Sequence, residues 1–243
     1  MSVKKKIFII FLVASLVFSV LAYLFYGSHR AWQQAQEKRN LLEKRRVVWL
    51  ELKDTLENQA LGFRGDTGII IEDLNTGWRF SLNQDKLFPS ASLVKIPIMV
   101  ACFQAVDEGR LTLNETMVLR VSHKTPGSGI LKNIASGTAI SLEKLIEIMI
   151  TKSDNTAANM LIERLGFDYF NDFFRKSGLR YTNLSRKMMD FQDRKRGVEN
   201  YTSASDIAYL LEKFYHRQFL SRTVSEKCLA MLLHQKVNDR IPR

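Results

Sequence analysis

The segment FPSASLVKIPIM at residues 88–99 places a serine three residues before a lysine in largely apolar surroundings. Residues three apart lie on one face of a helix, so the amine of Lys95 can reach the hydroxyl of Ser92. Burial and neighbouring charges can lower the pKa of a lysine until its neutral amine takes the serine proton. The pair therefore predicts a serine nucleophile for acyl transfer. The spacing is a weak signal alone, because Ser-x-x-Lys also occurs at Ser2 and Ser141.

The triplet Ser153-Asp154-Asn155 supplies a second polar group, in a break between two apolar segments that we predict to be helices. A loop held between packed helices can present polar side chains rigidly. Ser153 is then available to pass a proton to a leaving nitrogen. Asn155 can donate to a substrate carbonyl while its own carbonyl oxygen holds Lys95. The alternative is that Ser153 or Asp154 only caps the following helix.

Taken with the sequence around them, these two motifs resemble those of class A β-lactamases and related penicillin-recognising serine hydrolases. Four segments similar to that family follow one another in family order: LFPSASLVKIPIM, GSGIL, SLEKLIEIMITKSDNTAANMLIERLG and GLRYTNLSRKMMD. The resemblance covers about Val47 to Arg243, and the set of segments is far more specific than either motif. We therefore expect a β-lactamase-type serine hydrolase domain.

The resemblance also implies a role for each polar residue of the two motifs. Ser92 is the acylated nucleophile, and its backbone N–H is half of the oxyanion hole. Lys95 is the group that activates it, Ser153 is the proton relay, and Asn155 contacts both the substrate and the lysine. The implied substrate is a small-molecule β-lactam or a peptidoglycan peptide, and no cofactor is implied.

Two features depart from the family pattern. The position of the deacylating glutamate of class A enzymes falls on Met189, with Asp190 adjacent and Glu199 further along. Asp190 is a candidate base for deacylation, although a salt link or a helix cap explains it better. The Lys-Thr-Gly motif of an inner strand is absent, and residues 234–243 resemble its lead-in. We therefore expect the C-terminal strands of the sheet to be missing because the sequence is truncated.

These departures leave three functions open. The first is a β-lactamase-like hydrolase, which the overall similarity favours. The second is a D,D-peptidase of cell-wall metabolism that penicillin would trap, which the missing glutamate favours. The third is a catalytically inert relic, which the early end of the sequence favours.

An uncharged apolar segment, Ile7–Tyr26, precedes the domain. As a helix it is about 30 Å long, the thickness of the hydrocarbon core of a bilayer. Lys4, Lys5 and Lys6 come before it, so the N-terminus should stay in the cytoplasm. We predict a single-pass anchor in the cell (inner) membrane and a periplasmic, extracytoplasmic domain. A cleaved signal peptide is the alternative, although the segment lacks an Ala-x-Ala cleavage site.

The predicted organisation is a basic tip and anchor at 1–27, a polar helical stalk at 28–46 and the hydrolase domain at 47–243. The domain should have an α/β (α+β) fold, with an all-helical subdomain beside an antiparallel sheet. A hairpin is expected from strands at about Thr67–Glu72 and Trp78–Leu82. The predicted helices cover 92–107, 142–150 after a Ser141 cap, 155–165, 169–176, 205–215 and 223–235.

Other function classes find little support in the sequence. The net charge of +11 is concentrated in local runs, without a zinc-ligand spacing, an RNA-binding signature or a phosphate-binding glycine loop. We therefore expect no nucleic-acid partner and no metal site. Four histidines are present without a Gly-x-Ser-x-Gly elbow, which argues against a Ser/His/Asp triad. Cys102 and Cys228 lie in apolar helical patterns and are predicted to be buried thiols. The oligomeric state is left open.

Overall fold

The computed structural model describes residues 2–235 and divides into two compact units, one ending at Gly65 and the other beginning at Asp66. The first unit is a single exposed helix, α1 (Val3–Gly62). It contains an 18-residue window with a hydropathy of 2.8, so it is long and apolar enough to cross a membrane, as a signal sequence near an N-terminus also is. The helix continues past Val47, so no change of secondary structure marks the predicted start of the hydrolase domain there.

The second unit begins with the predicted hairpin. Strand β1 (Ile69–Asp73) pairs antiparallel with β2 (Trp78–Leu82), and Ile69 lies opposite Leu82. The turn is closed by the backbone N–H groups of Thr76 and Gly77, which both donate to the carbonyl of Asp73. Gly77 has a φ of +71°, a conformation that glycine adopts without steric cost. The Asn-Thr-Gly turn predicted from the sequence is therefore confirmed.

Four further strands are too short to leave a pattern in the sequence, and the sequence analysis missed them. Strand β3 (Phe88–Pro89) pairs with β6 (Tyr201–Thr202), and β4 (Thr116–Val118) pairs with β5 (Ala139–Ser141). All of the pairings among residues 2–235 are antiparallel and form separate two-stranded sheets. The β3–β6 pair matters for the site, because it fixes the chain just before Ser92. The lead-in expected at residues 234–243 lies mostly outside the described residues.

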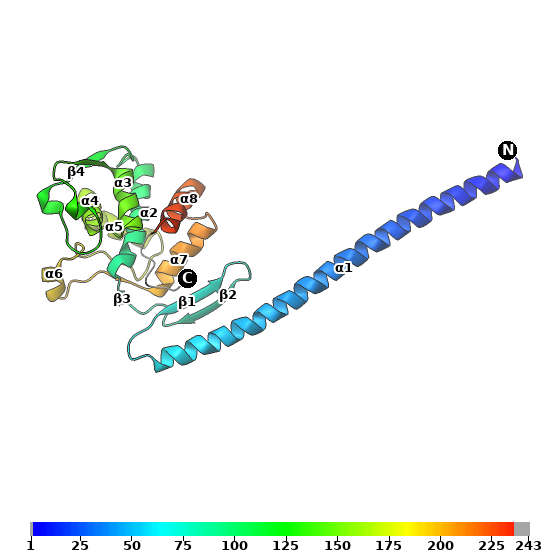
Figure 1. Ribbon diagram of the computed structural model, residues 1–243, viewed down its shortest axis with the longest axis horizontal. Coiled ribbons are helices and arrows are strands. Elements are labelled where there is room, and N and C mark those ends of the chain that lie inside the picture. The colour runs from blue at the N-terminus through cyan, green and yellow to red at the C-terminus, as the bar shows by residue number, and fades with distance from the viewer. Residues whose placement is uncertain (1, 236–243) are drawn as a thin grey trace. The chain divides into compact units, whose positions relative to one another are not determined.

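The helices form the larger part of the unit (Figure 1). Most predicted helix boundaries are confirmed to within about three residues, and the short helix α6 was not predicted. Ser141, Ser203 and Ser221 cap three helices by accepting a hydrogen bond from a backbone N–H of the first turn. The helices are α2 (Lys95–Asp107), α3 (Leu142–Thr151), α4 (Asn155–Leu165), α5 (Phe167–Lys176), α6 (Phe191–Lys195), α7 (Ala204–Tyr215) and α8 (Arg222–Leu233).

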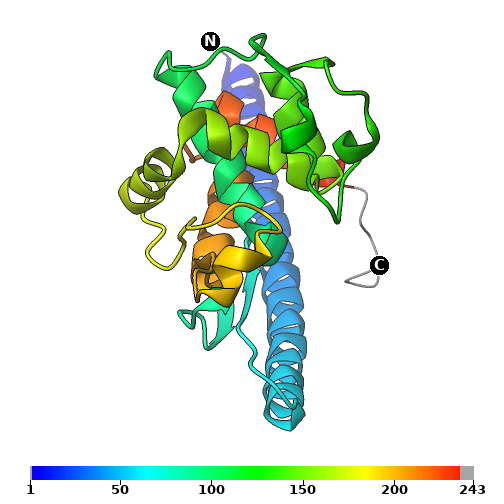
Figure 2. The ribbon, with the colours of Figure 1, turned by 90° about the vertical axis from the view of Figure 1, so that its left-hand side faces the viewer.

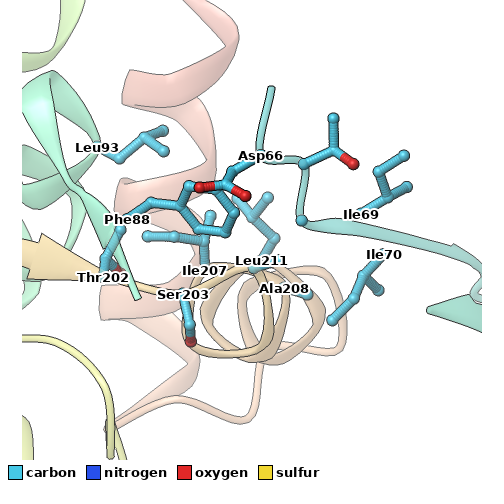
Figure 3. A pocket seen from close by; sticks show the side chains of 13 residues that line it. Asp66, Ile69, Ile70, Phe88, Leu93, Thr202, Ser203, Ile207, Ala208 and Leu211 are labelled. Carbon is cyan, nitrogen blue, oxygen red and sulfur yellow. The ribbon is translucent and has the colours of Figure 1, made fainter. Parts of the chain in front are cut away.

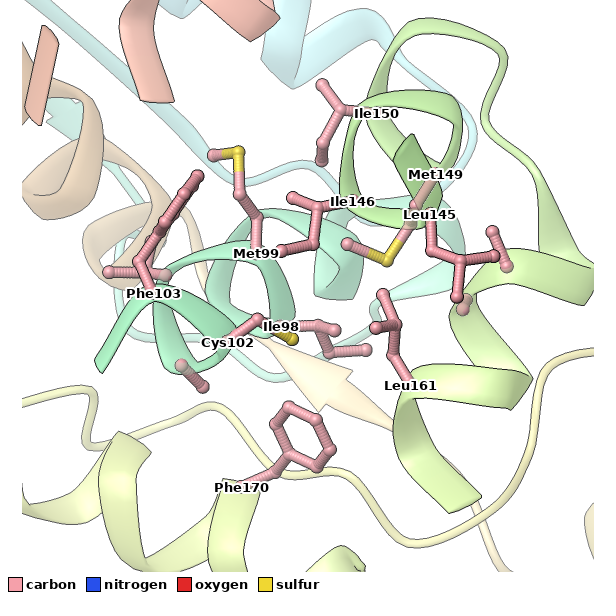
Figure 4. Packing of buried hydrophobic residues seen from close by; sticks show 14 of the residues in the cluster. Ile98, Met99, Cys102, Phe103, Leu145, Ile146, Met149, Ile150, Leu161 and Phe170 are labelled. Atoms are coloured by element: carbon pink, nitrogen blue, oxygen red, sulfur yellow. The ribbon is translucent and has the colours of Figure 1, made fainter. Parts of the chain in front are cut away.

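Helix α2 is the centre of the core. It is apolar on nearly all sides, which is typical of a helix surrounded by protein, and it contacts α3, α4, α5 and α8 (Figure 2). Its side chains meet those of the surrounding helices in one continuous cluster. The packing residues shown in Figure 4 include Ile98, Met99, Cys102 and Phe103 of α2 with Leu145, Ile146, Met149, Leu161 and Phe170.

Each such side chain stabilises the fold by about 1.5–3 kcal/mol when fully buried. Cys102 and Cys228 are buried and unbridged, as predicted. This rigid core carries the first turn of α2 and the break between α3 and α4, which are the two places where the polar motifs lie.

Candidate active site

Ser92 lies in a short 3₁₀ turn, Ala91–Val94, that runs directly into α2. The sequence predicted that this residue begins the helix, and the structure places it about one turn earlier. Two features fix the turn. The N–H of Ser90 donates to the carbonyl of Asn200 at 2.8 Å, and Ala91 has a φ of +45°. A left-handed backbone is unusual for a residue other than glycine and is often found at functional sites. The turn aims Ser92 at the positive end of the α2 dipole.

Lys95, in the first turn of α2, is 2% exposed. Its Nζ lies 3.4 Å from Ser92 Oγ, 3.1 Å from Ser153 Oγ, 2.6 Å from the carbonyl oxygen of Ser153 and 2.8 Å from Asn155 Oδ1. Burial lowers the pKa of Lys95 from 10.5 to about 8, and the negative charge of Asp154 partly opposes this shift. About a tenth of the lysine is therefore neutral at pH 7.

The partners of Lys95 determine where its proton-accepting site points. The carbonyl oxygens of Ser153 and of the Asn155 side chain can only accept hydrogen bonds, so they take two N–H groups of the amine. A neutral amine has two N–H groups and one lone pair. With both N–H groups bound to carbonyls, the lone pair is left for the hydroxyls of Ser92 and Ser153. A neutral amine held in this way can accept a hydroxyl proton.

Ser153 connects to Ser92 directly. Its Oγ donates to Ser92 Oγ at 3.0 Å. Because Lys95 Nζ is also within hydrogen-bond distance of both hydroxyls, each of the three groups contacts the other two. Ser153 has a φ of +48° and occupies the break between α3 and α4. The strained backbone turns both the hydroxyl and the carbonyl of this residue toward Lys95.

Asp154 caps helix α4. The sequence analysis gave this capping as the alternative to a catalytic role for the triplet. Asp154 is fully buried and accepts from the N–H of Ala157 at the start of α4. Its other oxygen accepts from the N–H groups of Ile130 at 2.6 Å and Leu131 at 2.9 Å. The residue therefore caps α4 and also ties the GSGIL segment to the site. The triplet at residues 153–155 therefore both caps α4 and positions the polar groups of the site.

Asn155 is held on both sides. Its Nδ2 donates to the carbonyl of Pro126 at 3.0 Å, and its backbone N–H donates to the carbonyl of Ser128 at 3.1 Å. The amide is therefore fixed with its oxygen toward Lys95. The structure brings together Ser92, Lys95, Ser153 and Asn155, as the motifs predicted.

Asn159, one turn further along α4, was missed by the sequence analysis. It is buried, and its side chain donates to Thr125 Oγ1 and to the carbonyl of Met188 and accepts from the N–H of Met188. It therefore fastens the loop before α6 to the segment that Asn155 also binds. The sequence feature that could have identified Asn159 is a polar residue within an otherwise apolar stretch of a predicted helix.

Asp190 caps the short helix α6. Its Oδ1 accepts from the N–H groups of Asp193 at 3.0 Å and Gln192 at 3.1 Å. These two hydrogen bonds hold the pKa of its carboxyl below the usual value, and the one from Asp193 has the larger effect. In the described part of the chain, the hydrogen bonds of its carboxylate run to α6 and none runs to Ser92 or Lys95. Glu199, the acid further along that the sequence also offered, is paired with Arg186 at 2.5 Å.

Met189, the neighbour of Asp190, lies closer to the site. A side-chain carbon built on Gly127 would fall 2.9 Å from Asn155 Nδ2 and 3.3 Å from the terminal methyl of Met189. The thioether therefore packs over the segment that Asn155 holds. Met189 has a φ of +62°, a second left-handed backbone near the site.

The chain is similar to known proteins in both sequence and fold. Residues 51–243 match a family model described as the β-lactamase enzyme family. A β-lactamase from Rhodobacter capsulatus is 32% identical over 147 residues, which are 60% of this chain and 49% of that protein. The extended-spectrum β-lactamase PER-1 from Pseudomonas aeruginosa is 23% identical and is covered over 58% of its length. The chain thus spans about half the length of these curated relatives.

Two solved structures are also similar. A β-lactamase from Sphaerobacter thermophilus is 35% identical with a TM-score of 0.68, and the match covers 75% of this chain and 69% of that one. PBP-A, a variant of which was solved as an acyl-enzyme complex with penicillin G, is 32% identical with a TM-score of 0.70, covering 78% and 70%. The folds agree, and the matched residues include both motifs. The chain therefore belongs to the β-lactamase enzyme family.

Proposed function

We propose that this chain is a membrane-anchored serine hydrolase that acts on β-lactams by acyl transfer through Ser92. The observation that carries the proposal is the position of the Lys95 amine, which two carbonyl oxygens hold within reach of the hydroxyls of Ser92 and Ser153. Membership of the β-lactamase enzyme family and similarity to a protein solved with bound penicillin G support it.

The reaction follows from these contacts. The neutral amine of Lys95 takes the proton of Ser92 as its Oγ attacks the carbonyl carbon of the β-lactam. The backbone N–H of Ser92, in the 3₁₀ turn that leads into α2, stabilises the negative charge that develops on the carbonyl oxygen. The carbon–nitrogen bond of the ring breaks, and Ser153 passes a proton from Lys95 to the leaving nitrogen. The product is an ester on Ser92, which water then hydrolyses to free the serine.

A second candidate is a penicillin-binding peptidase, in which the ester persists. The observation that favours it is the engagement of Asp190, whose carboxylate caps α6 rather than contacting Ser92. Hydrolysis of the ester needs a base to activate water. The two candidates therefore share the first step and differ in the lifetime of the ester.

The test is to incubate the full chain, in detergent, with a fluorescent penicillin and to follow the adduct by intact mass. Labelling followed by rapid loss supports the hydrolase, and a lasting adduct on Ser92 supports the peptidase. The Ser92→Ala variant is the control and should stay unlabelled. If the folded chain takes up no label at any dose, both candidates are wrong and the inert alternative is favoured.

The membrane anchor has its own test. If Ile7–Tyr26 is retained as a span, the chain should stay in the membrane pellet after a carbonate wash, at its full mass. The opposite result is a shorter, soluble chain with a new N-terminus after residue 26, as a cleaved signal peptide would give. Protease digestion of intact cells with a permeabilised outer layer should remove the domain and spare the lysines before the span.

A further inference from the structure

The segment at residues 127–132 lies against the start of α4 and ends in a lysine. Its backbone N–H and C=O groups are hydrogen-bonded to Asp154 and Asn155, two members of the triplet at the site. The amine of Lys132 folds back over the segment and donates to the carbonyl oxygen of Gly127. The segment therefore places a cation beside the residues that we propose to act on the substrate.

The half-buried Lys132 keeps most of its capacity to bind an anion. A lysine amine carries three N–H groups, and the carbonyl of Gly127 accepts from one of them. Among residues 2–235, no carboxylate forms an ion pair with Lys132. The carboxylate of Asp154, which lies next to the segment, already accepts from three backbone N–H groups. The charge of Lys132 is thus available to a ligand.

Gly127 separates this cation from the amide of Asn155. A side-chain carbon built on Gly127 would fall 2.9 Å from Asn155 Nδ2, while the carbonyl oxygen of the same residue contacts the amine of Lys132. Because glycine has no side chain, residue 127 leaves the space beside the amide unfilled. A group that is bound at the amide and crosses Gly127 therefore reaches Lys132 next.

The amide of Asn155 has an N–H group left for the substrate. Its nitrogen carries two, and the carbonyl of Pro126 accepts from one of them at 3.0 Å. A penicillin attacked by Ser92 has a second carbonyl close to the reacting one, in the amide that joins its side chain to the ring. If this carbonyl accepts from Asn155, the side chain of the penicillin extends past Gly127 toward Lys132.

A cavity of about 600 Å³ between the start of β1 and α7 is an alternative place for a substrate side chain (Figure 3). Its lining is mostly apolar, and the charged side chain among the described residues that line it is Asp66. Asp66 is paired with Lys86 at 2.5 Å. The lining therefore offers no unpaired positive charge, and a carboxylate is better placed at Lys132 than in this cavity.

We propose that Lys132 is a specificity residue that selects substrates whose side chain, next to the acylated carbonyl, carries a carboxylate. A carboxylate at this position forms a charge-assisted hydrogen bond with the amine. The proposal names the substrate class of the site and rests on the acyl transfer proposed for Ser92.

The test compares benzylpenicillin with carbenicillin, which differs from it by one carboxylate on the side chain. The second-order rate constant for forming the Ser92 adduct is measured by intact mass, with the full chain in detergent. The ratio of the two constants, carbenicillin over benzylpenicillin, should be at least tenfold higher for the wild type than for Lys132→Gln. Lys132→Glu should lower the ratio further, because it repels the carboxylate.

Lys176→Gln is the matched control. Lys176 contributes to a pocket with Gln104 and Glu108, near the C-terminal end of α2, whereas Lys95 begins that helix. The variant removes the same charge from the chain away from the site, so it should keep the ratio of the wild type. An equal fall in the ratio in Lys176→Gln and Lys132→Gln would show that only net charge matters and would overturn the proposal.

Salt gives a measurement on the wild type alone, which does not depend on how well a variant folds. In 1 M NaCl the Debye length falls to about 3 Å, so the ratio should drop toward that of Lys132→Gln. A ratio that is independent of both salt and Lys132, with both penicillins labelling the chain, refutes the role of Lys132 and leaves the acyl transfer standing. If neither penicillin labels the folded chain, the acyl transfer and this proposal are both wrong.

Discussion

Lys95 Nζ lies 2.8 Å from Asn155 Oδ1, although the two residues are 60 positions apart in the sequence. The contact joins the central helix of the core to the first residue of α4, and it is fixed from the other side by the hydrogen bond from Asn155 to Pro126. Because the amide cannot turn without losing that bond, its oxygen stays directed at the amine. The proton-accepting site of Lys95 is therefore set by residues from three separate parts of the chain.

Replacing Lys95 by methionine should lower the rate constant for labelling by fluorescent penicillin at least about 10³-fold, because the serine loses its base. Methionine has a similar length and no charge to bury, so the core should remain intact. Labelling kinetics and near-UV circular dichroism check the two statements. Labelling of the folded variant at the original rate would contradict the role assigned to the lysine.

The same variant should change how stability depends on pH. The pKa of Lys95 is about 8 in the folded chain and 10.5 ordinarily, so the unfolded state binds more protons between these values. The contribution of Lys95 to the free energy of unfolding is therefore constant below pH 8 and rises by about 3 kcal/mol up to pH 10.5. Urea titrations at several pH values should show this rise in the wild type, and Lys95→Met should lack it.

The rate of acylation should also follow the fraction of Lys95 that is neutral. Below pH 8 the neutral fraction grows about tenfold for each pH unit, and above it the fraction levels off. The second-order rate constant for penicillin labelling should trace this curve, with a midpoint near the pKa of about 8. A rate that is flat between pH 6 and pH 8 would exclude Lys95 as the titrating base.

Replacing Ser153 by alanine should remove the hydroxyl that donates to Ser92 while keeping the main-chain carbonyl that holds Lys95. The labelling rate should fall by about 10²-fold, the typical contribution of a positioned proton-transfer group. The midpoint of the pH profile should stay close to that of the wild type, since the burial of Lys95 is unchanged. A shifted midpoint with an unaltered maximal rate would indicate that Ser153 only positions the lysine.

Replacing Gly129 by alanine should be strongly destabilising, because a side-chain carbon there would lie 2.3 Å from the carboxylate of Asp154. Gly137 is the matched control, since it also has a left-handed backbone but has open space around it. Gly137→Ala should cost about 1–2 kcal/mol from backbone strain, and Gly129→Ala about 4 kcal/mol or more. Urea unfolding measures both. Equal losses of stability in the two variants would mean that Asp154 moves away from the added carbon at no cost in free energy.

Much of the fold followed from local patterns. The apolar run of α2, the apolar periodicity of α3, the serine caps and the Asn-Thr-Gly turn each depend on neighbouring residues, so the sequence specifies them directly. The Ser-x-x-Lys pair lies within one helical turn, and its spacing was sufficient to suggest it. The division of the chain at 1–27, 28–46 and 47–243 stays a prediction.

Other features depend on contacts between distant segments. The two-residue strands β3 and β6 exist only because Phe88 and Thr202 meet in the folded chain. The hydrogen bonds between Asn159 and Met188 likewise form only because distant segments meet in the folded chain. No short-range pattern encodes such contacts, and the sequence analysis missed them.

The residue types at positions 92, 95, 153 and 155, and the helices that carry them, were thus determined by the sequence alone. The tertiary structure decided what these residues can do together. Whether an amine is charged depends on its burial, and where its lone pair points depends on which oxygens surround it. Both are properties of packed neighbours far away along the chain. The capping of α6 by Asp190 is local by contrast, because the N–H groups that it accepts from lie only two and three residues further along.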